Sequence, residues 1–111
     1  MSKIFADYNF EDENYSIEIK RMGGSSELLI SEKSTLKMIK EKWDFNPTDS
    51  IGRCGYDYNL EIRKDGQLKD NCLMCFSCNT LSFEGTNPWR LYRINPDFIE
   101  NFMKMVKDER L

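Results

Sequence analysis

Residues 53–83 read RCGYDYNLEIRKDGQLKDNCLMCFSCNTLSF and contain the clearest structural pattern in the chain. Apolar and polar residues alternate from Tyr56 to Arg63, which is the period of a half-buried strand. Lys64-Asp65-Gly66 follows, and residues 68–76 form a second run of strand-forming residues. The pattern predicts a β-hairpin, and the rest of the chain must cover its apolar face.

The turn determines which residues of the two strands lie opposite each other. A three-residue loop with Gly66 in the left-handed conformation places Ile62 opposite Leu68. A two-residue Asp-Gly turn would set Ile62 against the charged Lys69, so we expect the three-residue loop. The expected opposite pairs are Arg63–Gln67, Ile62–Leu68, Tyr58–Cys72, Tyr56–Met74 and Cys54–Phe76.

The region before the hairpin alternates from residue 15 to residue 20, which predicts another strand. The run 23–26 is rich in glycine and serine and predicts a turn, with a short return strand over 27–31. A competing interpretation starts a helix at Ser26 and continues it to Trp43, and the sequence leaves both open. In either case Leu36, Ile39 and Trp43 have helical spacing, and we expect Asn46-Pro47 to end that helix.

The alternation changes phase after Cys78, which predicts a bulge or a turn near Asn79 and a further strand over 80–83. Another strand is expected over 89–94. Asn95-Pro96-Asp97 is typical of a helix start, and an apolar stripe follows over 98–106.

These elements predict one α+β domain, residues 1–111, with the order β-β-α-β-β-β-β-α. Its antiparallel sheet should have five to six strands, with two helices packed on one face. Residues 1–14 mix aromatic and acidic side chains without a clear period. They are expected to form an irregular acidic arm or a short strand.

The charge of the chain is unevenly distributed. The net charge is −3 over 111 residues, and residues 1–32 contain seven acids against three bases. This acidic end argues against a nucleic-acid partner, which would need clustered lysines and arginines, and it suits a basic protein partner. A solvated acidic loop without a function is the other interpretation. Neither an export signal nor a membrane-spanning run is found, so we expect a cytoplasmic protein with reduced thiols.

Four cysteines form the most conspicuous motif, Cys72-x-x-Cys75-x-x-Cys78 with Cys54 upstream. Four thiolates can hold zinc or an iron–sulfur cluster, which makes a metal-binding or redox module the alternative function. On a strand, however, Cys75 would face away from Cys72 and Cys78. We therefore expect buried thiols and no cofactor, with zinc, or a disulfide from Cys54 to the facing strand, as the alternative.

Catalytic signatures are absent from the sequence. The chain has no histidine, no glycine-rich phosphate loop and no nucleophile elbow, so we do not expect an enzyme. Residues 89–93 read WRLYR and place Arg90 and Tyr92 on one face of a strand. They could form a stacking platform for single-stranded nucleic acid or a protein-binding patch, or they could face the core.

Exclusion leaves binding as the expected activity. No family motif can be matched residue by residue. The class-level hypothesis is a small bacterial immunity protein, or antitoxin, that neutralises a toxin such as a nuclease by occluding its active site. Charge complementarity speeds such encounters. The expected contact residues are Asp7, Glu11, Asp12 and Glu13.

Overall fold

The predicted hairpin lies in the middle of one antiparallel sheet. A computed structural model describes residues 2–24, 26–48, 55–84 and 90–109. Its elements are β1 (Ser2–Lys3), β2 (Tyr15–Arg21), β3 (Ser26–Ile30), α1 (Lys33–Lys42), β4 (Asp44–Pro47), β5 (Tyr58–Lys64), β6 (Gln67–Cys75), β7 (Thr80–Phe83), β8 (Arg90–Arg93) and α2 (Pro96–Glu109). Within these residues the strand order is β1-β4-β8-β7-β6-β5-β2-β3.

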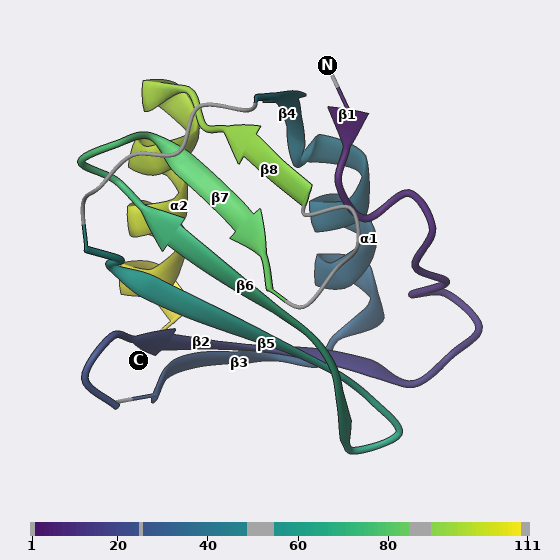
Figure 1. Ribbon diagram of the computed structural model, residues 1–111. Helices are drawn as coiled ribbons and strands as arrows, with labels where there is room; N and C mark the ends of the chain where they lie inside the picture. Colours follow the sequence, from purple (N-terminus) through teal and green to yellow (C-terminus); the bar gives the residue numbers. More distant parts are fainter. Residues whose placement is uncertain (1, 25, 49–54, 85–89, 110–111) are drawn as a thin grey trace.

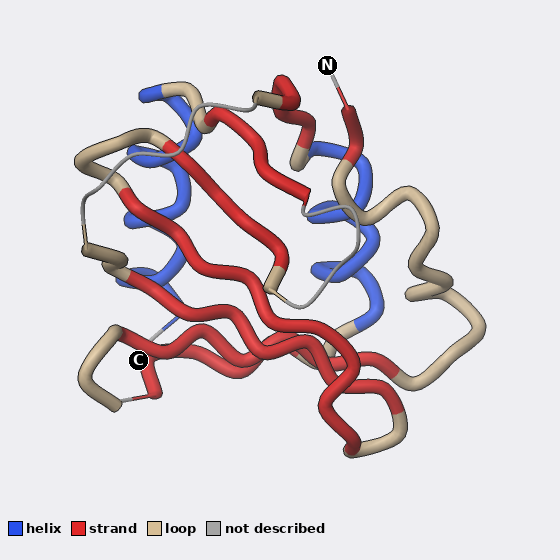
Figure 2. Tube along the Cα trace, in the orientation of Figure 1, coloured by secondary structure: helices blue, strands red, loops and turns tan. Residues whose placement is uncertain are grey.

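The α+β class is confirmed, with both helices on the same side of the sheet (Figures 1 and 2). Strand β3 followed by α1 also resolves the competing interpretations of residues 26–43 in favour of a strand and a helix. Strands β1 and β4 add two strands to the six that the sequence predicts. Asn95 starts α2 as expected, because its side-chain oxygen accepts the Phe98 N–H at 2.8 Å.

The end of α1 differs from the prediction. The helix ends at Lys42, and the Trp43 N–H donates to Ile39 O at 2.9 Å in the last turn. Asn46 and Pro47, the expected terminators, lie in β4 and pair with β8. Proline is tolerated there because it occupies the end of a short strand.

The predicted register of the central hairpin is wrong by one residue beside the turn and by two residues beyond the bulge. Asp65 and Gly66 form a two-residue turn with φ of 53° and 81°, and Lys64 pairs with Gln67. A bulge then leaves Lys69 without an opposite residue, so that Ile62 lies opposite Asp70. The corrected pairs that follow are Leu60–Cys72 and Tyr58–Met74. The tight turn matches the twist of the strands. The bulge exchanges Lys69 for Asp70 opposite Ile62 and sets Leu60 and Tyr58 opposite Cys72 and Met74.

The core fills the side of the sheet that carries the helices. Fully buried side chains come from every layer: Ile17, Ile19, Leu60, Ile62, Met74, Leu81 and Phe83 from the sheet, and Leu36, Ile39, Phe102 and Val106 from the helices. The N-terminal segment adds Ile4, Phe5, Tyr8 and Phe10, none more than 5% exposed. In the described part of the chain, neither helix is long and apolar enough to cross a membrane.

Candidate protein-binding surface

Residues 4–14, called the acidic loop below, alternate between buried aromatic and exposed acidic side chains. Phe5, Tyr8 and Phe10 point into the core, and their rings contact one another and Tyr15. The ring centroids of Phe5 and Tyr8, and those of Phe10 and Tyr15, are each 5.2 Å apart in edge-on geometry. Such ring pairs prefer this arrangement, so the irregular loop is anchored although it forms no regular element.

The tip of the β5–β6 hairpin holds the same loop from the outside. The Lys64 ammonium forms an ion pair with Glu13, and the Asp65 N–H donates to Asn14 O at 2.8 Å. The bulged Lys69 donates to the Tyr15 hydroxyl at 2.9 Å. The Lys69 ammonium also lies 5.2 Å from the centre of the Tyr8 ring. The bulge therefore directs Lys69 onto the aromatic anchor of the acidic loop.

A hydrogen bond inside the fold completes this attachment. The Tyr8 hydroxyl donates to the Asp70 carboxylate, the residue that the bulge places opposite Ile62. Burial, and next the bond to Asp70, raise the pKa of Tyr8 well above its usual value. Tyr8 is therefore a neutral donor at physiological pH.

Helix α1 holds the C-terminal half of the loop as well. The Lys33 ammonium donates to Glu11 O at 3.2 Å and to Glu13 O at 3.3 Å. Within the loop, the Asp12 N–H donates to the Asn9 side-chain oxygen at 3.2 Å. Aromatic anchors, hairpin and helix together hold the loop in one conformation.

The four predicted contact residues are thus brought together on one loop, but in different environments. Asp7, Glu11 and Asp12 are exposed. Glu13 is half-buried, and its carboxylate is occupied by Lys64. Three carboxylates therefore remain directed to solvent, and Glu13 has a structural contact of its own.

The other group of charged side chains, on the face of the sheet away from the helices, is internally balanced. Lys20 is 2.7 Å from Glu61, and Arg63 is 3.0 Å from Glu61 and 3.1 Å from Glu18. The hydrogen bond from Lys20, with that from Arg63, lowers the pKa of Glu61 against the opposing effect of desolvation. Two acids and two bases neutralise each other there, in contrast to the acidic loop.

The cysteines of the motif do not share one face of a strand. Cys72 is buried on the helix side, and burial, with the nearby charge of Asp70, raises the pKa of its thiol. Cys75 is buried but faces the opposite side of β6, as predicted. Cys78 is disulfide-bonded, so the expectation of reduced thiols is wrong for this residue. It lies in the turn after β6, and its N–H donates to Cys75 Sγ at 3.3 Å. Cys54 lies outside the described residues, among which no group of three metal-ligating side chains occurs.

Arg90 and Tyr92 share one face, as predicted, and this face is the core. The Arg90 guanidinium carbon lies 4.0 Å from the centre of the Phe83 ring. Its Nη2 donates to Ile4 O at 2.9 Å, and its Nε donates to the Tyr92 hydroxyl at 3.1 Å. Strand β8 is also an inner strand, between β4 and β7. The two side chains are therefore internal and do not form an exposed stacking platform; Trp89 lies outside the described residues.

Sequence reasoning missed Lys69 and Asp70, which attach the acidic loop to the hairpin. Two adjacent charged residues interrupt the apolar–polar alternation beside the turn, and this interruption was the available signal for a bulge. Comparison with protein-family models, curated proteins and solved structures finds no match to this chain. The function is therefore inferred from geometry and charge.

Proposed function

We propose that the protein is a small protein-binding inhibitor of the immunity-protein kind, and that it docks its acidic loop on a basic partner. The partner class that fits is a toxin with a cationic active site, such as a bacterial nuclease, which the loop would occlude. The observation that carries the proposal is the exposure of Asp7, Glu11 and Asp12 on a loop fixed by buried aromatic rings.

Fixation of the loop matters because binding by a mobile segment costs conformational entropy. A loop already held in its bound shape loses less freedom on association, which improves affinity without new contacts. Binding residues are commonly found on loops that a rigid scaffold positions. Aromatic anchors and hairpin contacts supply that scaffold here.

The charge pattern supports the same surface. The carboxylates of Glu18 and Glu61 are neutralised by Lys20 and Arg63, so they add little field beyond the sheet. Within the described part of the chain, the carboxylates of Asp7, Glu11 and Asp12 form no ion pair, although the Lys33 ammonium lies on backbone carbonyls of the same loop. An uncompensated negative patch attracts a cationic partner and raises the rate of encounter.

The proposal is tested by the salt dependence of association. Tagged protein is used to capture its partner from the native cell lysate at low salt, and association kinetics are then measured with the recovered partner. The triple variant Asp7→Asn, Glu11→Gln, Asp12→Asn should associate about tenfold or more slowly at low salt, with a flattened salt dependence. A matched control removes three exposed acids from the helices, Glu41→Gln, Asp97→Asn and Glu100→Gln, and changes the net charge equally.

The control variant should retain most of the wild-type rate, because its carboxylates lie outside the acidic loop. Equal slowing in both triple variants would show that only net charge matters. Kinetics of the loop variant that match the wild type at every salt concentration would exclude the loop as the docking surface.

A further inference from the structure

Strand β3 (Ser26–Ile30) forms one edge of the sheet and pairs only with β2 among the described strands. The opposite edge is β1, which is two residues long. One side of an edge strand presents backbone N–H and C=O groups to solvent, where another strand can pair with them. The longer edge of this sheet is therefore β3.

This edge is protected only at its N-terminal end, where a bulge leaves Glu27 without an opposite residue in β2. Residues 28–30 continue as a regular strand. Natural edge strands commonly carry lysine, proline or an inward-pointing charge that discourages pairing. Strand β3 reads SELLI, and its single charged residue, Glu27, is paired with Arg21 at 3.3 Å. Leu29 lies opposite Glu18, on the face away from the helices, and is 61% exposed.

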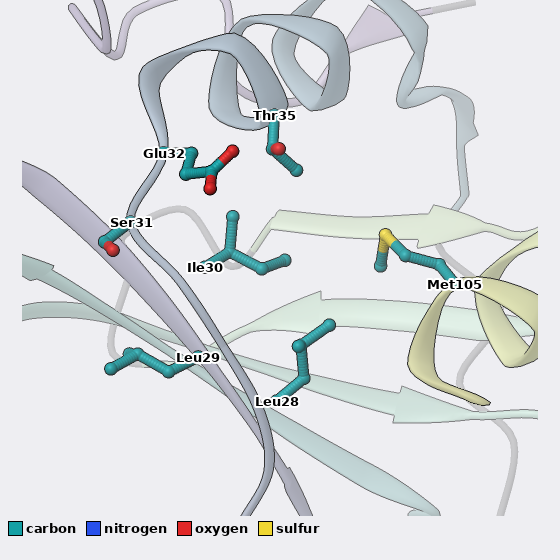
Figure 3. Close-up of a pocket in the computed structure, with 7 residues that line it drawn as sticks. All are labelled: Leu28, Leu29, Ile30, Ser31, Glu32, Thr35 and Met105. Atoms are coloured by element: carbon teal, nitrogen blue, oxygen red, sulfur yellow. The ribbon is translucent and has the colours of Figure 1, made fainter. Parts of the chain in front are cut away.

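The helix side of the same strand borders a pocket of mixed lining, with Ser31, Glu32 and Thr35 on its polar side (Figure 3). Leu28 and Ile30 point into it from β3 and Met105 from α2, whereas Leu29 points away. The pocket has a volume of about 140 Å³. Its apolar side, formed by Leu28, Ile30 and Met105, lies next to the free edge of β3.

We propose that β3 pairs antiparallel with β3 of a second copy of this chain, about a two-fold axis at Leu29. In this register Leu29 faces Leu29 of the second copy on the outer side. Leu28 faces Ile30 on the inner side, at the pocket. The regular pairing covers residues 28–30, because the bulge at Glu27 interrupts the strand on one side. The only charged residue of β3 therefore lies outside the paired segment, and no like charges are set opposite each other.

The second copy is the occupant because the edge is complementary to itself. Residues directly opposite each other must point to the same face, which limits the symmetric registers. The neighbouring register, centred on Leu28, would set Glu27 against Leu29 and leave the exposed leucines unpaired with each other. Two-fold pairing also uses the edge completely, so association stops at a dimer. This surface is separate from the acidic loop, and the inference does not depend on the proposed function.

Sedimentation velocity of the full chain tests the proposal, over about 1 µM to about 1 mM, the range of weak association. We expect the dimer fraction to rise with concentration. Leu29→Lys should increase the dissociation constant about tenfold or more, because it sets two lysines opposite each other. Leu68→Lys is the matched control: Leu68 is 56% exposed, lies on the β5–β6 hairpin and should leave dimerisation unchanged. Circular dichroism confirms that both variants are folded.

Cross-linking tests the register itself. Opposite residues of antiparallel strands have Cα atoms about 4.5–5.5 Å apart, which suits a disulfide. Leu29→Cys should therefore form a covalent dimer under copper-phenanthroline oxidation much faster than Leu68→Cys. A wild-type chain that stays monomeric throughout would overturn the proposal. So would an open-ended polymer, a dimer insensitive to Leu29→Lys, or equal cross-linking of the two cysteine variants.

Discussion

At the scale of single residues, two buried weak acids lie on the same side of the sheet. Tyr8 is 5% exposed and donates to Asp70, while Cys72 is fully buried two residues along β6 from that carboxylate. Burial is the main cause that raises the pKa of each group, and the negative charge of Asp70 adds to it. Both groups are therefore held in their protonated forms by the fold.

This environment predicts a loss of stability in alkaline solution. Below about pH 8 both groups are protonated whether the chain is folded or unfolded, and their contribution is complete. Above the unfolded pKa values, about 8.5 for the thiol and about 10 for tyrosine, only the unfolded chain releases these protons. The free energy of unfolding should then fall by at most about 1.4 kcal/mol per pH unit for each group. Urea unfolding between about pH 8 and about pH 11 measures this slope.

Matched variants assign the slope to its residues. Tyr8→Phe and Cys72→Ala should each flatten the pH dependence, because each removes one titrating group. Tyr56→Phe is the control, because it removes a half-buried tyrosine whose hydroxyl forms no hydrogen bond within the described residues. It should keep the wild-type slope. An identical slope in all four proteins would contradict the assignment.

At the scale of elements, the β5–β6 hairpin combines two local irregularities. Its two-residue turn needs the left-handed conformation at both Asp65 and Gly66, and its bulge inserts Lys69. Together they bring Lys64, Lys69 and Asp70 to the acidic loop. The hairpin therefore acts as a clamp on the loop as well as a part of the sheet.

The turn conformation can be tested by adding a methyl group. Gly66 has φ of 81°, and a Cβ there would meet no atom within 4 Å, so the cost of Gly66→Ala is backbone strain alone. We expect a loss of about 1 kcal/mol in the free energy of unfolding. Gly55→Ala is the control, since Gly55 is equally uncrowded but has no left-handed φ. Denaturant unfolding should show it to be neutral or slightly stabilising, and equal losses in both variants would argue against the turn.

At the scale of the whole molecule, the N-terminal segment closes one end of the core. Its buried aromatic residues contact Tyr15 of β2, Phe83 of β7 and Trp43 at the end of α1. Arg90 of β8 also donates to Ile4 O, so the segment is bound to distant parts of the chain. The residues expected to form an arm are an integral part of the folded core.

This arrangement predicts a large effect of core substitutions in the acidic loop and a small effect of surface ones. Phe10 has no exposed surface, and Phe10→Ala should lower the free energy of unfolding by about 3–5 kcal/mol. Asp7→Ala, three residues away and exposed, should change it by less than about 0.5 kcal/mol. Denaturant unfolding of both variants measures the contrast. A small effect of Phe10→Ala would mean that the segment detaches from the fold without destabilising it.

The candidate site was predicted from the sequence in part. The acidic residues between positions 7 and 13 could be chosen as contact residues because an excess of acidic side chains is visible in the sequence itself. The conformation in which the loop exposes them could not be predicted from the sequence. It depends on Lys33, Lys64 and Lys69, which contact the loop only in the folded chain. The same limit applies to Arg90 and Tyr92. The alternation of the sequence predicts that they share one face of a strand, but it does not show that the core covers this face.

The sequence by itself determined the α+β class, the order of most elements and the start of α2 at Asn95. These features follow from periodicity and capping, which depend on the conformations of neighbouring residues. Only the tertiary structure decided the short strands β1 and β4, the bulge at Lys69 and the free edge at β3. Each of these depends on pairing between segments far apart in the chain, and a strand as short as β1 or β4 has too few residues to show a period. The local conformations available to these segments have similar energies. Burial of the common core favours one set of strand pairings, and that pairing fixes the local conformation.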